Sequence, residues 1–337
     1  MSSETIQLGH GAGGGLSREL MDGLIAPRVG LSHAGVGDGE ALELDIARIA
    51  MTTDTFVVDP IFFDEGDIGR LAVCATVNDL ATGGAVPRYL TLSLVIEQGL
   101  PVADLTRVLE SVRVAATEAD VQVVAGDTQV VRVGEADKLF LAAAGVGEFV
   151  HDVDLGAQRV RPGDAVIVTG ALGNHGIQVL SLREGLDAAA RVSSDCAPLV
   201  GLVWNLLEDY APQVHCMRDL ASGGLVGVLD ELARVAGVSV ELEEHRLPIG
   251  RKTRMAAERL GSDPLHLPSG ASICLVVDGA AAADVLELIR WQPQGQAAQI
   301  VGTVRERAHG AVTLVGIDGD GENVLEALRG GEPPRLR

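Results

Sequence analysis

The alternation of helix-like and strand-like patterns along all 337 residues constrains the fold more than any other feature of this chain. In segment 102–116, apolar residues recur at three- and four-residue spacing, which predicts a helix with one buried face. The apolar run 121–125 predicts a buried strand that ends at Gly126, before a functional loop. The same reasoning predicts strands at 165–168 and 271–277 and a helix at 224–236. Because no low-complexity tract interrupts this order, we expect an α/β or α+β fold.

The chain is longer than the roughly 100 to 200 residues of a typical domain, so two domains are expected. A polar, turn-rich stretch at 150–163 breaks the pattern, and we place the boundary there, giving domains 1–155 and 156–337. The sequence DLATGG at 79–84 recurs as DLASGG at 219–224. This repeat indicates that each domain contributes an acidic loop of the same design.

The charge balance excludes one class of partner. The formal net charge is -21, which repels the phosphates of nucleic acid, so a nucleic-acid partner is not expected. An acidic surface also keeps a protein in solution, which is the ordinary explanation of such a charge. A surplus of carboxylates further suits divalent cations, which can bring anionic phosphates to them.

The cysteines and the apolar runs indicate the compartment. Four cysteines lie far apart without a CxxC pair, which argues against a structural zinc site and against a disulfide framework. The first residues show no basic stretch followed by an apolar run, and no apolar stretch reaches the ~18 residues of a spanning helix. We therefore expect a cytoplasmic protein without a membrane segment.

Acidic or amide side chains follow or interrupt apolar segments at five places, namely Asp38, Asp54, Asn78–Asp79, Asp127–Thr128 and Asp219. Side chains emerge where strands end, and hard oxygen ligands in this number suit Mg²⁺ bound to a nucleotide polyphosphate. Asp and Asn are also common in turns, so each position alone has an ordinary structural explanation. The set of five predicts a magnesium and nucleotide site.

The N-terminal run HGAGGG at 10–15 is dense enough in glycine for its backbone N–H groups to approach phosphate oxygens. With Gly9 it matches GxGxxG, but no convincing strand precedes it, so the dinucleotide interpretation is weak. A flexible arm is the alternative. No GxxxxGK[ST] motif occurs, which excludes a P-loop.

Two further side chains are candidates for chemistry. His175 lies in a glycine-rich turn that opens a predicted helix, where an imidazole can transfer a proton or bind phosphate, or can serve only in capping and packing. Cys216 lies just before Asp219, where a thiol could act as a nucleophile. A buried cysteine in a strand is the commoner case.

Several segments in order resemble one family: HGAGG at 10–14, TTDTF and VNDLA within 52–101, VAGDT within 124–147, GALGNHG within 163–186 and MRDLASGG within 217–244. They are similar to the hydrogenase maturation factor HypE family of the PurM-like superfamily. Relatives of that family include aminoimidazole ribonucleotide synthetase, selenophosphate synthetase and thiamine monophosphate kinase. The resemblance covers nearly the whole chain. It implies an N-terminal α/β domain that dimerises through its sheet, a C-terminal α/β domain, and ATP held by Asp-rich loops near the dimer interface.

The resemblance also implies roles for individual residues. Metal ligands would fall on Asp54, Asp79, Asp127 and, as a looser match, Asp38. Nucleotide contacts would fall on Asp54, Asn78, Asp79, Asp127 and Thr128, and on Gly11, Gly13 and Gly14 of the N-terminal segment. Asp219 should lie beside them, and we take it, with His175 of the glycine-rich turn, as the catalytic candidates. The implied cofactors are ATP and Mg²⁺.

The HypE family dehydrates an S-carbamoyl group on its own C-terminal cysteine to a thiocyanate, because phosphorylation by ATP converts the amide oxygen into a leaving group. This sequence ends in PPRLR, where the family tail resembles PRIC. The family's DPTRGG is DLASGG at 219–224, a segment usually ending in Asn-Glu-Gly or Cys-Glu-Gly reads PSG at 268–270, and Asn174 stands where the family has Asp. The nucleotide side is retained and the substrate side is altered.

We therefore expect an ATP-dependent dehydratase that activates a carboxamide on a free small molecule or on a separate carrier. One alternative is a hydrogenase maturation protein acting with a carbamoyltransferase of the HypF type, with Cys216 or a partner's thiol in place of the tail. A small-molecule kinase like thiamine monophosphate kinase is the second. The third is a non-catalytic scaffold, which the retained acidic loops disfavour.

Overall fold

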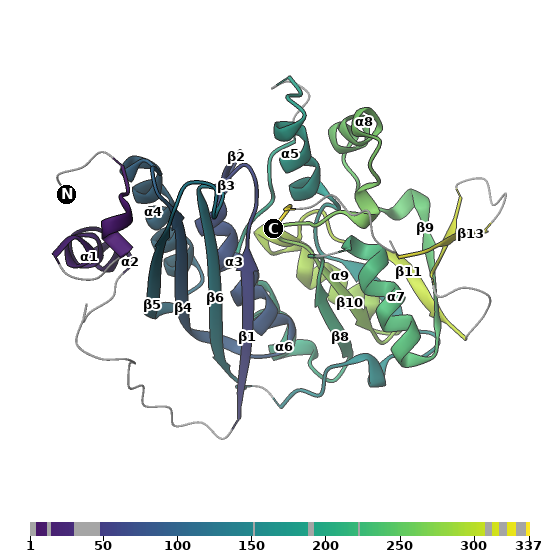
Figure 1. Ribbon diagram of the computed structural model, residues 1–337. Helices are drawn as coiled ribbons and strands as arrows, with labels where there is room; N and C mark the ends of the chain where they lie inside the picture. Colours follow the sequence, from purple (N-terminus) through teal and green to yellow (C-terminus); the bar gives the residue numbers. More distant parts are fainter. Residues whose placement is uncertain are drawn as a thin grey trace.

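The computed structural model describes residues 5–11, 15–29, 48–150, 152–187, 192–221, 223–306, 312–316, 322–327 and 335–337. Two large β-sheets, each with helices packed on it, lie side by side (Figure 1), and a small two-stranded sheet accompanies them. The predicted α/β class is confirmed. The boundary between 155 and 156 stays a prediction; the segment between the last strand of the first sheet and the first strand of the second contains it.

The first sheet has the strand order β1 (Ile49–Phe56), β6 (Leu139–Glu148), β4 (Val86–Glu97) and β5 (Gln122–Val131). Its neighbours are antiparallel except for the parallel pair β4 and β5, which α4 (Val102–Glu118) connects. Helix α3 (Ile68–Thr82) and α4 pack on one face of this sheet (Figure 1). The helix expected at 102–116 is therefore confirmed.

The predicted strand at 121–125 is confirmed in kind but wrong in its end. It runs on past Gly126 to Val131, because the long strand β4 supplies hydrogen-bond partners as far as Glu97. Asp127 and Thr128 consequently lie within a strand, paired with Ser93 and Leu94 of β4, and not in a loop.

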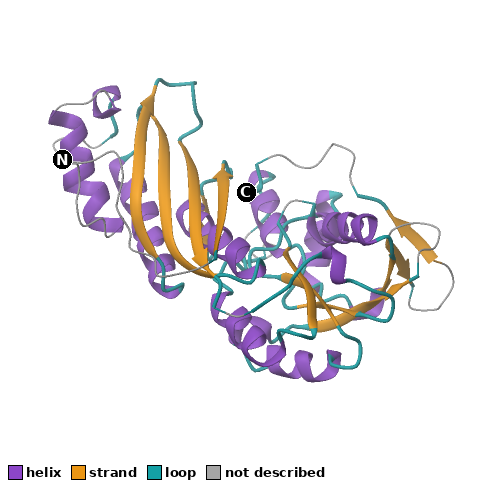
Figure 2. Cartoon of the chain, turned by 90° about the horizontal axis from the view of Figure 1, so that it is seen from below, coloured by secondary structure: helices purple, strands orange, loops and turns teal. Residues whose placement is uncertain are grey.

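The second sheet has the order β13 (Glu322–Leu325), β12 (Val312–Val315), β9 (Ser239–Glu243), β11 (Gln299–Arg305), β7 (Ala165–Val168), β10 (Ile273–Val277) and β8 (Val214–Asp219). Helix α7 (Gly224–Ala236) covers one face, while α6 (Val200–Tyr210) and α9 (Ala282–Arg290) cover the other. Figure 2 shows these helices around the strands. Because both faces are covered, β7 and β10 are buried at every position, as their uninterrupted apolar runs predict.

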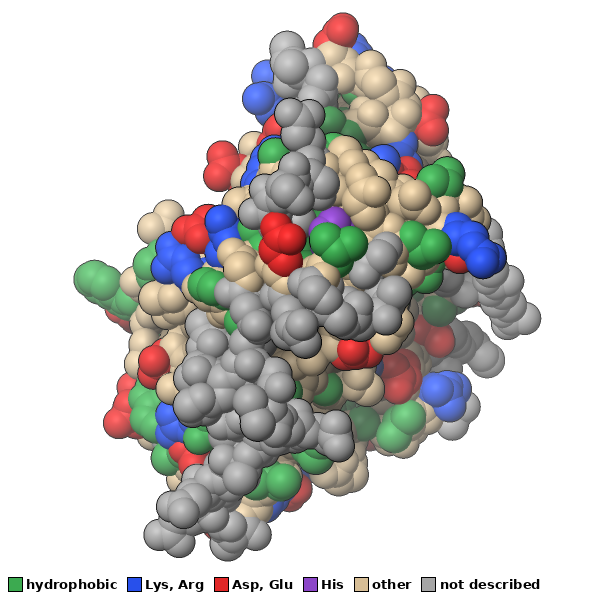
Figure 3. Space-filling model, turned by 60° about the vertical axis from the view of Figure 1, so that its left-hand side comes forward, with side chains coloured by type: hydrophobic (Ala, Val, Ile, Leu, Met, Phe, Trp, Pro, Cys, Tyr) green, Lys and Arg blue, Asp and Glu red, His purple; other side chains and the backbone are tan. Residues whose placement is uncertain are grey.

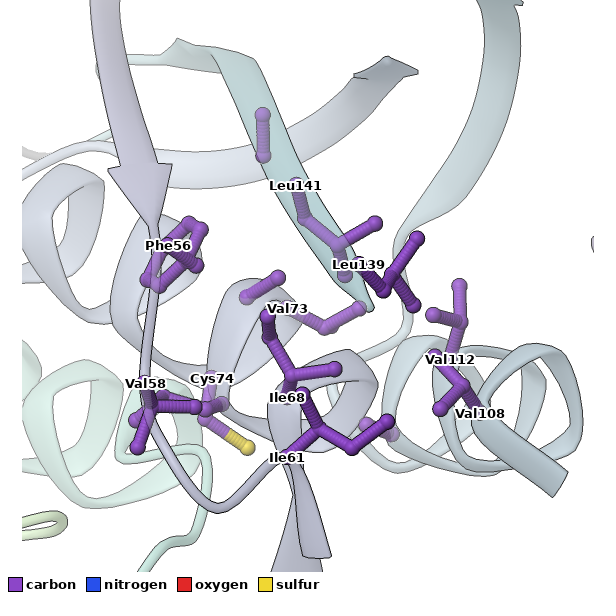
Figure 4. Close-up of a cluster of buried hydrophobic side chains, with 14 of the residues drawn as sticks. Phe56, Val58, Ile61, Ile68, Val73, Cys74, Val108, Val112, Leu139 and Leu141 are labelled. Carbon is purple, nitrogen blue, oxygen red and sulfur yellow. The ribbon is translucent and has the colours of Figure 1, made fainter. Parts of the chain in front are cut away.

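The core beneath the first sheet joins it to α3 and α4 (Figure 4). Phe56 and Val73 are buried there, with 0% and 1% of their surface exposed. The same core also takes in Ile177 of α5 (Asn174–Arg183) and Leu336. The two halves of the chain therefore share apolar packing near the end of β1.

The remaining elements are short. They are η1 (Leu8–Gly11), α1 (Gly15–Leu20), the π-helical turn η2 (Met21–Ile25), α2 (Ala26–Val29), β2 (Phe62–Phe63), β3 (Gly66–Asp67), η3 (Ala157–Arg159), η5 (Glu244–Arg246), α8 (Arg251–Leu260), η6 (Pro264–His266) and η7 (Pro293–Gly295). Within the described ranges, no helix is long and apolar enough to cross a membrane.

Candidate functional site

Three carboxylates from both halves of the chain meet between the two sheets. Asp54 lies on β1, two residues before the buried Phe56, so its side chain points to the same face of the sheet, toward α3. Asp79 lies in the last turns of α3, where the Thr52 hydroxyl donates to its Oδ2 at 3.4 Å. Asp219 ends strand β8 of the second sheet. We call these three residues the carboxylate cluster.

The electrostatics of the carboxylate cluster follow from its crowding. Burial, then the negative charge of Asp219, then Asp54, raise the pKa of Asp79 to about 8. Burial also raises the pKa of Asp219, against the lowering effect of Arg337. Three anions this close cannot all stay ionised without a cation, so the site favours positive charge.

Arg337 supplies such a charge. Its Nη2 lies 2.8 Å from Oδ1 of Asp54 and 3.8 Å from Oδ2 of Asp79, and its guanidinium sits 5.4 Å from the centre of the Phe56 ring. The backbone N–H of Val57 donates to the Arg337 carbonyl at 2.9 Å. The end of β1 thus positions both the Asp54 carboxylate, which it carries, and the Arg337 guanidinium, whose backbone it binds.

A cavity of about 670 Å³ opens beside the carboxylate cluster. Its polar end is formed by Asp79, Asp219 and Arg337, and its apolar wall by Val228, Leu232 and Val235 of α7. Pockets with an apolar body and a few convergent polar groups are typical ligand sites. The cavity therefore suits a ligand with an uncharged part and a charged part.

Asn78 has a different environment from its neighbour Asp79. Its amide nitrogen donates to the Ala197 carbonyl at 3.1 Å, and its oxygen accepts from the Leu199 N–H at 2.7 Å. The side chain is buried and is not part of the cavity lining. In this conformation it ties α3 to the segment before α6.

Asp127 and Thr128 lie away from the carboxylate cluster. The pairing of the strands puts Asp54, Ala143, Leu92 and Gly126 in one row across the sheet. Three strand spacings separate the ends of this row, or about 14 Å. Asp127, one residue further, points to the opposite face of the sheet, where it is exposed. Within one chain it does not reach the cluster.

Thr128 and the N-terminal segment both lie at the edge of the first sheet that β5 forms, which we call the outer edge. Thr128 points to the helix-covered face, and its hydroxyl is buried with no hydrogen-bond partner among the described residues. Gly11 ends η1, which contacts β5 at this edge (Figure 1). Gly13, Gly14 and Asp38, which were predicted to contact the nucleotide or the metal, lie outside the described residues.

His175 is enclosed at the start of α5. Its Nε2 lies 2.7 Å from the Leu336 carbonyl and its Nδ1 lies 3.0 Å from the Ser194 hydroxyl, so Nε2 donates and Nδ1 accepts. Burial lowers the pKa of His175 to about 4, against the effect of the Leu336 hydrogen bond. The neutral ring holds segment 335–337 in place, and its predicted part in proton transfer stays a prediction.

Cys216 lines the cavity, but burial raises the pKa of its thiol to about 11. A thiol is a much weaker nucleophile than a thiolate. The other three cysteines of the chain are also buried and free.

The functional residue that sequence reasoning missed is Arg337. The sequence drew attention to this tail only for its missing thiol. The available signal was a basic residue near the end of a strongly acidic chain, which does not reveal which carboxylates it meets.

The chemistry of the donor set fits a divalent cation, although no three His, Cys, Asp or Glu side chains of the described residues converge on one point. A guanidinium already lies between Asp54 and Asp79. Oδ2 of Asp54 is buried without a hydrogen-bond partner in the described part of the chain. Carboxylate oxygens are the ligands that Mg²⁺ requires, and those of Asp54 and Asp79 would become available to it when the Arg337 guanidinium moves away.

The surface seen from the β5 side carries acidic and basic side chains interspersed with apolar ones (Figure 3). No continuous basic patch is visible among its coloured atoms.

Comparison with known proteins places the chain in a family. Family models for the N-terminal and C-terminal domains of AIR synthase related proteins match residues 37–149 and 161–315. The chain is 39% identical to the carbamoyl dehydratase HypE of Azotobacter vinelandii over 98% of this chain and 97% of that protein.

Solved structures agree. The crystal structure of the hydrogenase maturation protein HypE in complex with ATP superposes with a TM-score of 0.94 at 36% identity, over 99% of this chain and 100% of that one. A HypE–HypF complex superposes with a TM-score of 0.80 at 37% identity, over 85% and 92% of the two chains. The chain belongs to the HypE family of AIR synthase related proteins.

Proposed function

We propose that this protein is an ATP- and Mg²⁺-dependent dehydratase that phosphorylates the oxygen of a carboxamide or carbamoyl group and then releases phosphate to leave a nitrile or thiocyanate. The observation that carries the proposal is the carboxylate cluster, with a cation between two of its members, at the mouth of a cavity between the domains. A fold does not require three acidic side chains to be brought together in a partly buried place, and withdrawing them from water is costly.

The reaction needs positive charge next to the phosphoryl group that is transferred. An amide oxygen is a poor leaving group until it is phosphorylated, and the transfer of a phosphoryl group from ATP to this oxygen develops negative charge that must be neutralised. Mg²⁺, when bound, supplies that neutralisation and orients the polyphosphate. Asp54, Asp79 and Asp219 would hold the metal, and the apolar wall of α7 would exclude water from the reacting group.

Asp127 and Thr128 enter this proposal through a homodimer. Figure 1 shows α3 and α4 behind the first sheet. By the alternation of side chains along β1 and β5, Asp127, Ile49 and Met51 lie on the opposite face. Met51 is 70% exposed, which is unusual for an apolar side chain inside a sheet. Two such faces packed together would bury these residues and bring Asp127 toward the site of the partner chain.

The substrate group is carried by another molecule in this proposal. None of the four cysteines is exposed, and the one that lines the cavity has a raised pKa, so none is suited to accept a carbamoyl group. A relative has been crystallised as a HypE–HypF complex, which supports a carbamoyltransferase of that type as a partner.

The test is turnover by the purified protein with ATP and Mg²⁺, alone, with a panel of small carboxamides, and with a HypF-type carbamoyltransferase. ADP, free phosphate and product mass are followed together. We expect phosphate release that depends on one substrate, and a product lighter than that substrate by one water. A product heavier by a phosphoryl group would instead make this protein a kinase, and absence of turnover in every mixture would overturn the proposal.

A further inference from the structure

We propose that Arg337 is a phosphate-binding residue of this site. It neutralises the carboxylate cluster when no nucleotide is present, and it turns to the phosphoryl oxygens once a divalent cation occupies the carboxylates. This inference rests on the proposed function and adds a residue to it.

The first support is the position of the guanidinium. It touches two members of the carboxylate cluster and also lines the cavity, with 22% of its side chain exposed. A group in this place meets any phosphate that a metal on Asp54 and Asp79 brings in. Arg218, the other arginine of the cavity, is instead paired with Glu231 at 3.2 Å.

The second support is the way the backbone of segment 335–337 is held. The Arg335 carbonyl accepts from the Asp59 N–H at 3.3 Å, and Nε of Arg335 donates to the Val57 carbonyl at 2.8 Å. Leu336 is buried in the core, and His175 holds its carbonyl. Because the backbone is anchored on both sides, the Arg337 side chain can turn while its Cα stays in place. If Arg337 left the site together with the whole segment 335–337, all these contacts would have to break.

The third support is the set of donors that remain free. Nη2 lies close to Asp54, yet neither Nη2 nor Nε of Arg337 makes a well-directed hydrogen bond within the described residues. A guanidinium has five N–H donors in a planar fork that matches phosphate oxygens. Because both nitrogens are buried, the carboxylate contacts of Arg337 are charge contacts that leave donors of this fork unsatisfied until the side chain turns.

Electrostatics explain why the Arg337 guanidinium would exchange the carboxylates for phosphate oxygens. A divalent cation on the carboxylates repels the guanidinium and removes the anions that hold it. The polyphosphate that accompanies the metal supplies new anions nearby. Arginines that meet a transferring phosphoryl group contribute large rate factors in other phosphoryl-transfer enzymes.

The test compares the wild type with Arg337→Ala, Arg337→Gln and Arg337→Lys, using the full chain. Mn²⁺ binding without nucleotide is measured first by titration. We expect Arg337→Ala and Arg337→Gln to bind Mn²⁺ about tenfold more tightly, because no guanidinium competes for the carboxylates. Arg337→Lys should stay near the wild type, because it keeps the charge.

Binding of a non-hydrolysable ATP analogue and turnover are measured next. Arg337→Ala should lower kcat about a hundredfold or more, and Arg337→Lys should also lose much of it, because an ammonium lacks the planar fork. Arg305→Ala is the matched control, since it removes an exposed arginine at the end of β11 that pairs with Glu241 of β9 and does not line the cavity. Melting curves show whether each variant is folded.

Two results would overturn the inference. Unchanged Mn²⁺ affinity in folded Arg337→Gln would show that the guanidinium does not occupy the metal site. An unchanged or higher kcat, with tighter Mn²⁺ binding, would make Arg337 a simple blocking group. If the wild type turns over no substrate, the proposed function fails, and loss of affinity for the ATP analogue in Arg337→Gln still decides whether Arg337 binds phosphate.

Discussion

The carboxylate cluster and the outer edge at β5 contain residues of the same kind, yet the fold treats them differently. Asp54, Asp79 and Asp219 meet between the two sheets, whereas Asp127 lies about three strand spacings away on the opposite face. Similar acidic motifs in a sequence therefore need not form one site in one chain. The position of a strand in its sheet and the face of each side chain determine which of them meet.

The largest expected effect comes from the carboxylate cluster. Asp79→Asn should lower turnover about a hundredfold or more, because it removes a charge that would hold the metal but keeps the shape of the side chain. The measurement is kcat with saturating ATP and Mg²⁺. Asp120→Asn is the matched control, since Asp120 is exposed in a turn with φ of 52°, a conformation that Asn tolerates well. Equal loss in both variants, or none in Asp79→Asn, would contradict a metal-binding role.

The second prediction concerns the outer edge. Asp127→Asn should lower turnover at least tenfold only if Asp127 acts in the site of a partner chain. Mixing it with Asp79→Asn after partial unfolding and refolding should then restore activity to about a quarter of the wild type. Half of the randomly formed dimers would be mixed, and each mixed dimer would have one intact site.

The control for this experiment is each variant refolded alone, which should stay inactive. No recovery in the mixture, from a sample shown to contain mixed dimers, would mean that the two regions do not share a site. Full activity of Asp127→Asn alone would remove the outer edge from the function altogether.

Local sequence patterns predicted an element well where it is a helix with one buried face or a strand buried on both faces of its sheet. The one-sided apolar pattern of α4 and the uninterrupted apolar run of β7 are examples. The extension of β5 past Gly126 was not predictable, because it depends on the length of β4, its partner in the sheet. Local propensity does not include the hydrogen bonds that a neighbouring strand offers.

The site was predictable only in part for a similar reason. Residue type and resemblance pointed to Asp54, Asp79 and Asp219, and the structure brings these three together. Nothing in the sequence separates Asn78 from Asp79, although one turns to a backbone segment and the other to the cavity. Arg337 is distant in sequence from every residue that it contacts, so only the folded chain reveals its place.

Asn78 gives the third prediction, which is smaller and concerns stability. Asn78→Ala should lower the free energy of unfolding by about 1–3 kcal/mol, because the Leu199 N–H and the Ala197 carbonyl lose their buried partner. Asn78→Asp keeps the acceptor for Leu199 and is the matched comparison. Denaturant unfolding measures both. A stability change near zero in Asn78→Ala would contradict a structural role and would favour the nucleotide contact predicted for Asn78 from the sequence.

The smallest expected effect separates two histidines by the direction of their pKa shifts. His175 is buried and neutral, and burial lowers its pKa to about 4, so below the usual pKa near 6.5 the unfolded chain binds a proton that the folded chain does not. Stability should therefore fall as the pH drops from about 6.5 toward 4. His175→Gln should show a shallower loss of Tm over this range.

His266 is the control because its shift has the opposite sign. The hydrogen bond to Asp263 raises the pKa of His266, so the folded chain holds this proton more tightly and gains stability at acid pH. This gain develops as the pH falls through the raised pKa and is complete below about 6.5. His266→Gln should therefore lower Tm by a few degrees at and below that pH without changing the slope toward pH 4, whereas His175→Gln should make that slope shallower. Parallel Tm curves for the wild type and His175→Gln would show that the enclosed imidazole is not the group whose protonation opens the contact with segment 335–337. The acid sensitivity would then have to come from another buried group.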